Sequence, residues 1–165
     1  MDAPGRGARS RPGVRRPERG PQSRRAAGVG DVAGERRSVQ RGVEAINRGN
    51  IEPLLKELDH EVEWHDVFGL MLGGEARIYR GHEGVRQLFD DLYESFAETD
   101  SEYSEIRDLG DRTIAIGRLR TRGVESGAAT ESPIWTISQW RNGKAVRVRT
   151  YLDPEEALEA AGLLE

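Results

Sequence analysis

The hydrophobic pattern of this chain changes from a helical period to a two-residue period near its middle. Between Val85 and Phe96, apolar residues recur every three or four positions, which is the spacing of one helix face. Apolar and polar residues then alternate, as in half-buried strands, along residues 103–109, 112–124, 131–140 and 144–152. A long helix followed by consecutive strands predicts an α+β domain with helices packed on one concave face of a curved sheet.

Two shorter helices and one strand are expected before the long helix. Apolar residues recur at helical spacing over residues 35–48, and Gly49 follows as a natural left-handed terminator. Asn50 can then cap a second helix at residues 51–58. Residues 61–67 alternate in the manner of a half-buried strand.

An Asn142-Gly143 pair between the last two expected strands is the strongest short signal for a β-hairpin. A two-residue turn at this point fixes the register of the two strands. With that register, the more apolar face carries Trp135 and Ile137. We therefore expect that face to lie toward the core, and Arg147 and Arg149 to face solvent or a partner chain.

Shorter segments complete the expected order. Residues 68–77 predict a glycine-containing loop with exposed apolar side chains, which would cover a cavity mouth or meet another subunit. Asp153 and Pro154 predict the start of a short last helix, and Gly162 predicts its end.

The first 34 residues differ in composition from the rest of the chain. They hold eight Arg, three acidic residues and no aromatic residue, a net charge of about +5 in a chain of net charge −4. This composition predicts a disordered tail at residues 1–34 and one folded domain at residues 35–165. An arm that binds nucleic acid usually includes aromatic residues for base stacking, so we do not expect nucleic-acid binding. A solvated tail and a translation start at Val29 or Val32 are the alternatives.

The chain contains no cysteine, which excludes disulfides, thiol catalysis and cysteine-based zinc sites. No apolar run approaches the roughly 20 residues that a membrane-spanning helix needs. The basic N-terminal region is not followed by the apolar segment of a signal peptide. We therefore expect a cytoplasmic protein without a membrane segment.

The sequence predicts no metal site and no cofactor. Its three histidines are His60, His65 and His82, and the first two fall on opposite faces of the expected strand. We expect His65 on the outer surface. His82 begins the long helix, where a cationic imidazole is disfavoured, and we expect a structural role for it.

Arginines alternate along one expected strand at positions 118, 120 and 122. An anion site is one interpretation of this pattern. We favour a solvated or subunit-facing surface on which these arginines pair with the many acidic residues.

The strand at residues 61–67 carries the first candidate for chemistry. Val62, Trp64 and Asp66 fall on one face, which is apolar except for the Asp66 carboxylate. In an apolar cavity the pKa of Asp66 would be raised, because burial disfavours the charged form, and Asp66 would suit general acid–base catalysis near neutral pH. An Asp at a strand end also commonly accepts hydrogen bonds from loop amides, so both interpretations stay open.

Four segments resemble, in order and spacing, those of SnoaL-like proteins of the nuclear transport factor 2-like superfamily. These segments are Ala45–Asn50, Val62–Asp66, Tyr79–Val85 and Trp140–Lys144. The tail at residues 151–163 resembles one bacterial branch. The resemblance implies a cone-shaped α+β barrel, in which a curved antiparallel sheet wraps around helices. It also implies a homodimer through the outer sheet face, with one pocket per subunit.

The superfamily includes ketosteroid isomerase, cyclases, dehydratases and non-enzymatic binding domains, so the resemblance does not determine a reaction. Asp66 matches the general base of the isomerase. The Tyr and Asp of the isomerase oxyanion hole fall on Gly42 and near Trp135 or Thr136. Because these two donors are absent, we do not expect steroid isomerisation.

Two functions remain open. The first is an isomerase, cyclase or hydratase that acts on a small apolar molecule, with Asp66 as the catalytic acid or base. The second is a non-catalytic ligand-binding or dimerisation domain, in which Asp66 has a structural role. The side chains that we expect to line the ligand pocket are Trp64, Phe68, Tyr79, Phe89, Tyr93 and Trp135.

Overall fold

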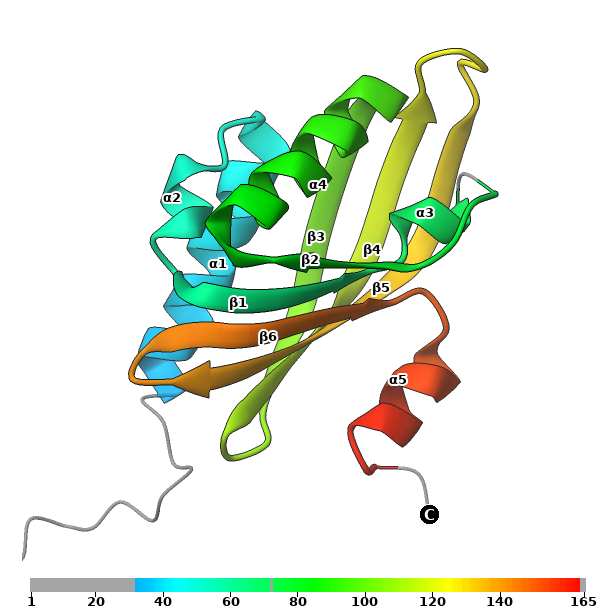
Figure 1. The fold of residues 1–165 in the computed structure, drawn as a ribbon. Helices are drawn as coiled ribbons and strands as arrows, with labels where there is room; N and C mark the ends of the chain where they lie inside the picture. Colours follow the sequence, from blue (N-terminus) through cyan, green and yellow to red (C-terminus); the bar gives the residue numbers. More distant parts are fainter. Residues whose placement is uncertain (1–31, 72, 164–165) are drawn as a thin grey trace, which may run out of the picture.

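The structure is a computed structural model and describes residues 32–71 and 73–163. Its elements are α1 (Val32–Arg48), α2 (Glu52–Leu55), β1 (Leu58–Asp66), α3 (Phe68–Met71), β2 (Arg77–Arg80), α4 (Gly81–Ser95), β3 (Phe96–Asp108), β4 (Arg112–Gly123), β5 (Ala129–Arg141), β6 (Lys144–Tyr151) and α5 (Pro154–Ala160). Figure 1 shows a strongly bent sheet with α1 and α4 on its inner side and α5 apart from them. This is the predicted α+β architecture.

The boundaries of several elements differ from the prediction. The expected tail lies outside the described residues except for Val32–Gly34, which form the start of α1. The expected loop at residues 68–77 contains the single turn α3 and leads directly into β2, which was not predicted. Strand β3 begins at Phe96, seven residues before the alternation that predicted it, because the long helix ends at Ser95.

The six strands form one sheet in the order β2-β1-β6-β5-β4-β3. All neighbouring strands are antiparallel except β1 and β6, which are parallel. The sheet is therefore mainly antiparallel, as expected, and the parallel pair was not predicted. Pairing β1 with β6 joins the first and last strands of the described residues.

Helix α4 fills the bend of the sheet. Its apolar stripe packs as predicted, with Val85, Leu88, Phe89 and Leu92 each at most 2% exposed. Gly81 turns the chain from β2 into this helix at φ +69°, a conformation that favours glycine. Among the described residues, no helix is both long and apolar enough to cross a membrane.

The hairpin of β5 and β6 forms at the predicted turn, with Asn142 and Gly143 at φ 53° and 76°. Its register shifts after the second pair, because Trp140 lies opposite Ala145 whereas Gln139 lies opposite Arg147. The extra residue forms a β-bulge. Beyond the bulge, the residues of one strand lie on the opposite face from the one that continuous pairing with the other strand would give them.

The bulge reverses the predicted orientation of β5. Its residues Ile134, Thr136, Ser138 and Trp140 face the interior together with Val148 of β6. Trp135 and Ile137 lie on the outer face instead, in the cluster that includes α5, so the expected inward orientation of these two residues is wrong.

Helix α5 covers part of the outer face. Asp153 caps it as predicted, because its Oδ1 accepts a hydrogen bond of 2.9 Å from the Glu155 amide. Ala157 and Ala161 pack with Ile114, Ile137 and Tyr151 in a second hydrophobic cluster. The homodimer through the outer sheet face stays a prediction, and α5 occupies part of the surface that it would use.

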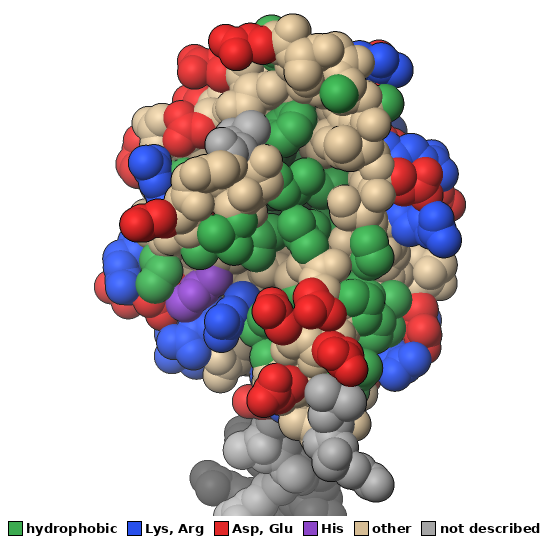
Figure 2. Space-filling model, turned by 90° about the vertical axis from the view of Figure 1, so that its right-hand side faces the viewer, with side chains coloured by type: hydrophobic (Ala, Val, Ile, Leu, Met, Phe, Trp, Pro, Cys, Tyr) green, Lys and Arg blue, Asp and Glu red, His purple; other side chains and the backbone are tan. Residues whose placement is uncertain are grey.

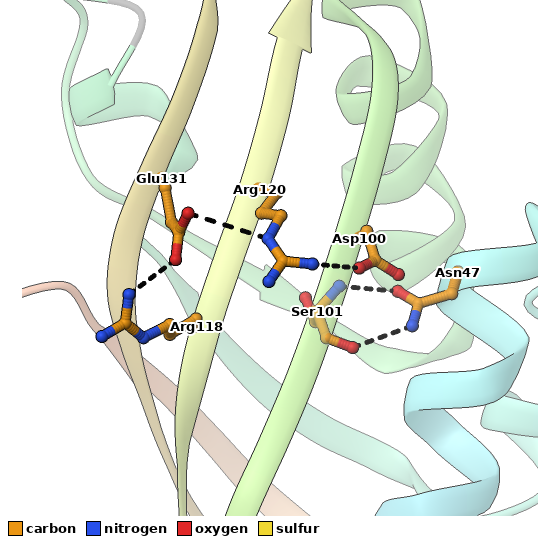
Figure 3. A network of polar contacts seen from close by, with 6 residues as sticks. All are labelled: Asn47, Asp100, Ser101, Arg118, Arg120 and Glu131. Atoms are coloured by element: carbon orange, nitrogen blue, oxygen red, sulfur yellow. Dashed lines mark hydrogen bonds and ion pairs between the residues drawn. The ribbon is translucent and has the colours of Figure 1, made fainter.

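The remainder of the outer face carries paired charges. Arg118 Nη1 lies 2.6 Å from Glu131 Oε1, and Arg120 lies 3.8 Å from both Glu131 and Asp100 (Figure 3). All four side chains are well exposed, in agreement with the predicted solvated surface. On the face where α3 and α5 lie, hydrophobic side chains gather in the middle, and charged side chains surround them (Figure 2).

Candidate functional site

A cavity of about 70 Å³ lies between the helices and the inner face of the sheet. Its lining comes from α1, α2 and strands β1, β3, β5 and β6, with one side chain each from α3 and α4. The sequence separates these elements, and the bend of the sheet brings them together (Figure 1). Most of the lining is apolar, which makes the cavity a candidate binding site for a small apolar molecule.

Trp64 of β1 and Phe89 of α4 form the aromatic part of the lining. Their rings meet edge to face with centroids 5.5 Å apart, and the two side chains are 6% and 1% exposed. Phe68 of α3 also lines the cavity. The structure therefore brings three of the predicted pocket residues together.

A row of hydroxyl groups lies among the apolar side chains. Tyr103 of β3 and Thr136 of β5 share a hydrogen bond of 2.7 Å between their hydroxyl oxygens. Burial raises the pKa of Tyr103 to about 12, so its phenol stays neutral at physiological pH. Ser101, Ser138 and Thr150 also line the cavity.

Two polar groups of the cavity lining have no hydrogen-bond partner among the described residues. These are the indole Nε1 of Trp64 and the hydroxyl Oγ1 of Thr99, and both atoms are buried. Buried polar groups in folded proteins are nearly always hydrogen-bonded. The two unpaired groups therefore distinguish this cavity from an ordinary packing defect.

Glu57, which follows α2, is the one charged residue among the described residues that line the cavity. Its Oε1 accepts a hydrogen bond of 2.7 Å from Arg41 of α1. This hydrogen bond lowers the pKa of Glu57 below its ordinary value, although burial opposes the effect. Glu57 is therefore a paired carboxylate.

Asp66 lies at the end of β1 and is 4% exposed, but it does not line this cavity. Its Oδ1 accepts a hydrogen bond of 3.0 Å from the Phe68 amide, and its Oδ2 accepts one of 3.3 Å from the Gly69 amide. Burial raises the pKa of Asp66 above its ordinary value, and the amide hydrogen bonds offset part of that rise. The carboxylate thus anchors the start of α3, which is the structural interpretation, and still has the raised pKa that we expected.

Asp66 lines a second cavity, of about 250 Å³, on the other side of Phe68. Arg77 and Tyr79 of β2 and Asp91 of α4 line it as well, which makes it more polar than the first cavity. The Tyr79 hydroxyl lies 3.5 Å from Asp91 Oδ2, and burial raises the pKa of Tyr79. Phe68 belongs to both linings and separates Asp66 from the apolar cavity.

The other predicted pocket residues lie elsewhere. Tyr93 packs against Phe89 and donates a hydrogen bond of 2.8 Å to the Ile46 carbonyl, so it ties α4 to α1. Trp135 does not line the cavity and packs beside the α5 cluster, because the β5–β6 bulge places it on the outer face.

The histidines are not grouped at one site. His65 is on the outer face, where burial and the nearby Arg149 lower its pKa. His82 Nε2 lies 3.0 Å from the Leu58 carbonyl, and its ring is 5.1 Å from that of His60. Within the residues that the structure describes, no three His, Asp or Glu side chains are arranged to hold a metal ion.

Sequence reasoning missed Glu57, Thr99, Tyr103 and Thr136. Thr99 precedes the alternation from which β3 was inferred, and the bulge reversed the face on which Thr136 was expected. Tyr103 lay in an expected strand, but the sequence did not indicate which face was inward.

Residues 39–148 match the SnoaL-like domain family. No curated protein sequence matches the chain. An NTF2-like protein of unknown function from Burkholderia pseudomallei K96243 has a TM-score of 0.66 and 22% identity, covering 76% of this chain and 95% of its own. TerC, crystallised with polyporic acid, has a TM-score of 0.66 and 19% identity, covering 78% and 98%.

A protein from Catenulispora acidiphila with a ketosteroid isomerase-like fold, in complex with trimethylamine, gives a TM-score of 0.60 at 12% identity, covering 77% of this chain and 93% of its own. These likenesses agree with the bent sheet and the helices on its inner side. The chain belongs to the SnoaL-like domain family and has the nuclear transport factor 2-like fold.

Proposed function

We propose that this protein binds a small, mainly apolar molecule in the cavity between its helices and the inner face of the sheet. The observation that carries the proposal is the composition of the lining, in which apolar side chains surround a few hydroxyl groups and one unpaired indole N–H. Two proteins of the same fold were crystallised with organic molecules, polyporic acid and trimethylamine, which also supports a binding role.

A cavity-filling substitution tests this proposal. Ala145 lines the cavity and is 2% exposed, so Ala145→Leu would place additional carbon atoms against the space that a ligand needs. Ala97→Leu adds the same atoms at an exposed position of β3 and serves as the control. We expect small hydrocarbons and ketones to bind the wild type and the Ala97→Leu variant, and to bind Ala145→Leu at least about tenfold more weakly. Ligand-observed NMR measures this difference, and equal binding to all three proteins would contradict the proposal.

Acid–base catalysis by Asp66 is the second candidate. It is supported by the raised pKa of the Asp66 carboxyl and by its position beside Tyr79 and Arg77 in the polar cavity. Phe68 stands between Asp66 and the apolar cavity, so this function requires Phe68 to move when a substrate binds.

Proton exchange at carbon separates this candidate from simple binding. A general base at Asp66 would accelerate exchange of the α-hydrogens of a bound ketone with D₂O. We would measure that exchange by NMR for the wild type and Asp66→Asn, after confirming that both bind the ketone. Equal exchange rates for the two proteins would rule out the catalytic role of Asp66 and leave the binding proposal intact.

A further inference from the structure

Trp64 and Trp140 line the same cavity, but only one of them has its indole N–H occupied by a protein group. Trp140 Nε1 donates a hydrogen bond of 2.9 Å to Thr113 Oγ1. Trp64 Nε1 is buried and has no partner among the described residues. An indole N–H can only donate, so Trp64 provides an unused donor in a mainly apolar lining.

A second unused group belongs to the same cavity lining. Thr99 of β3 has a buried hydroxyl without a partner in the described part of the chain. Trp64 lies on β1 and Thr99 on β3, so the two groups come from different strands of the cavity lining. A hydroxyl can donate or accept, so Thr99 does not restrict the ligand to either role. Trp64 can only donate, so it is Trp64 that requires an accepting atom on the ligand.

The charge of the lining restricts the occupant further. Glu57 is the only lining residue of the described chain that is charged at neutral pH, and Arg41 already pairs with it. An ionic ligand would lose its hydration without gaining a free counter-charge, which is strongly unfavourable. The size of the cavity, about 70 Å³, is roughly half of the 150 Å³ in which benzene binds in an engineered cavity. The occupant is therefore small, or it is the narrow end of a larger molecule.

We propose that the ligand of this cavity is a neutral compound with an accepting oxygen, such as a ketone. This oxygen would accept a hydrogen bond from the Trp64 indole N–H. This inference rests on the proposed binding function and specifies the chemical class of its ligand. It assigns to Trp64 the role of orienting the ligand, and Trp140 contributes only packing.

A matched pair of probes tests the inference. Cyclobutanone and methylenecyclobutane have the same ring and differ by an oxygen in place of a methylene group. Their dissociation constants would be measured for the wild type, Trp64→Phe and Trp140→Phe. We expect Trp64→Phe to weaken ketone binding relative to hydrocarbon binding by about threefold to tenfold, because it removes one hydrogen bond and keeps an aromatic ring. Trp140→Phe, which removes an indole N–H that is already occupied, should leave that ratio unchanged.

The indole N–H signals of the wild type give a second readout that does not depend on the folding of the variants. Cyclobutanone should move the Trp64 signal downfield and leave that of Trp135, on the outer face, in place. One outcome would show that the inference is wrong and would leave the binding function standing. In that outcome both probes bind, the ratio of their dissociation constants is the same in all three proteins, and the Trp64 signal does not move. If neither probe perturbs any cavity residue, both the inference and the binding function are wrong.

Discussion

The side-chain amide of Asn47 on α1 pairs with the backbone of Ser101 on β3 in the manner of a neighbouring strand. Asn47 Nδ2 donates to the Ser101 carbonyl at 2.8 Å, and Asn47 Oδ1 accepts from the Ser101 amide at 2.9 Å (Figure 3). Because β3 is an edge strand, these backbone groups have no strand beside them. The pair attaches α1 to the sheet next to the cavity.

Asn47→Ala should destabilise the protein by about 1–3 kcal/mol, because it removes two partly buried hydrogen bonds and leaves their backbone partners unpaired. Urea unfolding measures the change. Asn50→Ala is the matched control, since Asn50 accepts only one exposed hydrogen bond from Glu52, and it should cost about 0.5 kcal/mol. Equal losses in the two variants would show that the Asn47–Ser101 pair contributes no special stability.

The stability of the wild type relative to Asp66→Asn should fall as the pH rises from about 4 to 8. Burial raises the pKa of Asp66 in the folded protein, so folding favours the protonated acid. The favourable contribution is complete below the unfolded pKa and is lost as the pH rises through the folded pKa. Thermal unfolding at several pH values measures the difference between the two proteins.

Asp153→Asn is the control for this pH series, because Asp153 also accepts a backbone hydrogen bond but lies at the surface. At low pH, Asp66→Asn should itself cost on the order of 1 kcal/mol, since its NH2 group replaces one of the two oxygens that accept from the Phe68 and Gly69 amides. A wild-type advantage over Asp66→Asn that grows with pH would show that the amide hydrogen bonds outweigh burial.

Tyr103→Phe should cost about 1–2 kcal/mol of stability, because it leaves the Thr136 hydroxyl without its partner in the cavity wall. Thr136→Val should have a similar effect from the other side. The double variant should lose less stability than the sum of the two single losses. The difference, which is the coupling energy of the pair, should be about 0.5–1.5 kcal/mol. Denaturant unfolding of the three variants gives the coupling, and fully additive losses would indicate that the hydrogen bond contributes little.

Glu131→Gln should destabilise the protein only slightly, because its two arginine partners are exposed. The loss should largely disappear in 1 M NaCl, where screening is strong. Glu105→Gln, which breaks the exposed pair with Arg107 only, is the comparison. Denaturant unfolding at low and high salt measures both, and a loss that persists at high salt would point to a packing role for Glu131.

The sequence determined those features that depend on neighbours along the chain. The helical stripe of α4, the Asn142-Gly143 turn and the Asp153 cap each rest on local spacing or local backbone chemistry, and each formed as predicted. The order of the four segments that resemble SnoaL-like proteins was also sufficient to indicate the fold. The family match and the solved structures agree with that fold.

The tertiary structure decided the features that depend on contacts between distant segments. One bulge in the β5–β6 hairpin moved Trp135 to the outer face and brought Thr136 inward, because side chains alternate and a single extra residue reverses their direction. The position of Phe68 separated Asp66 from the apolar cavity, which alternation along β1 could not reveal. Alternation determines which side chains share a strand face, whereas packing across the domain determines which of them share a cavity.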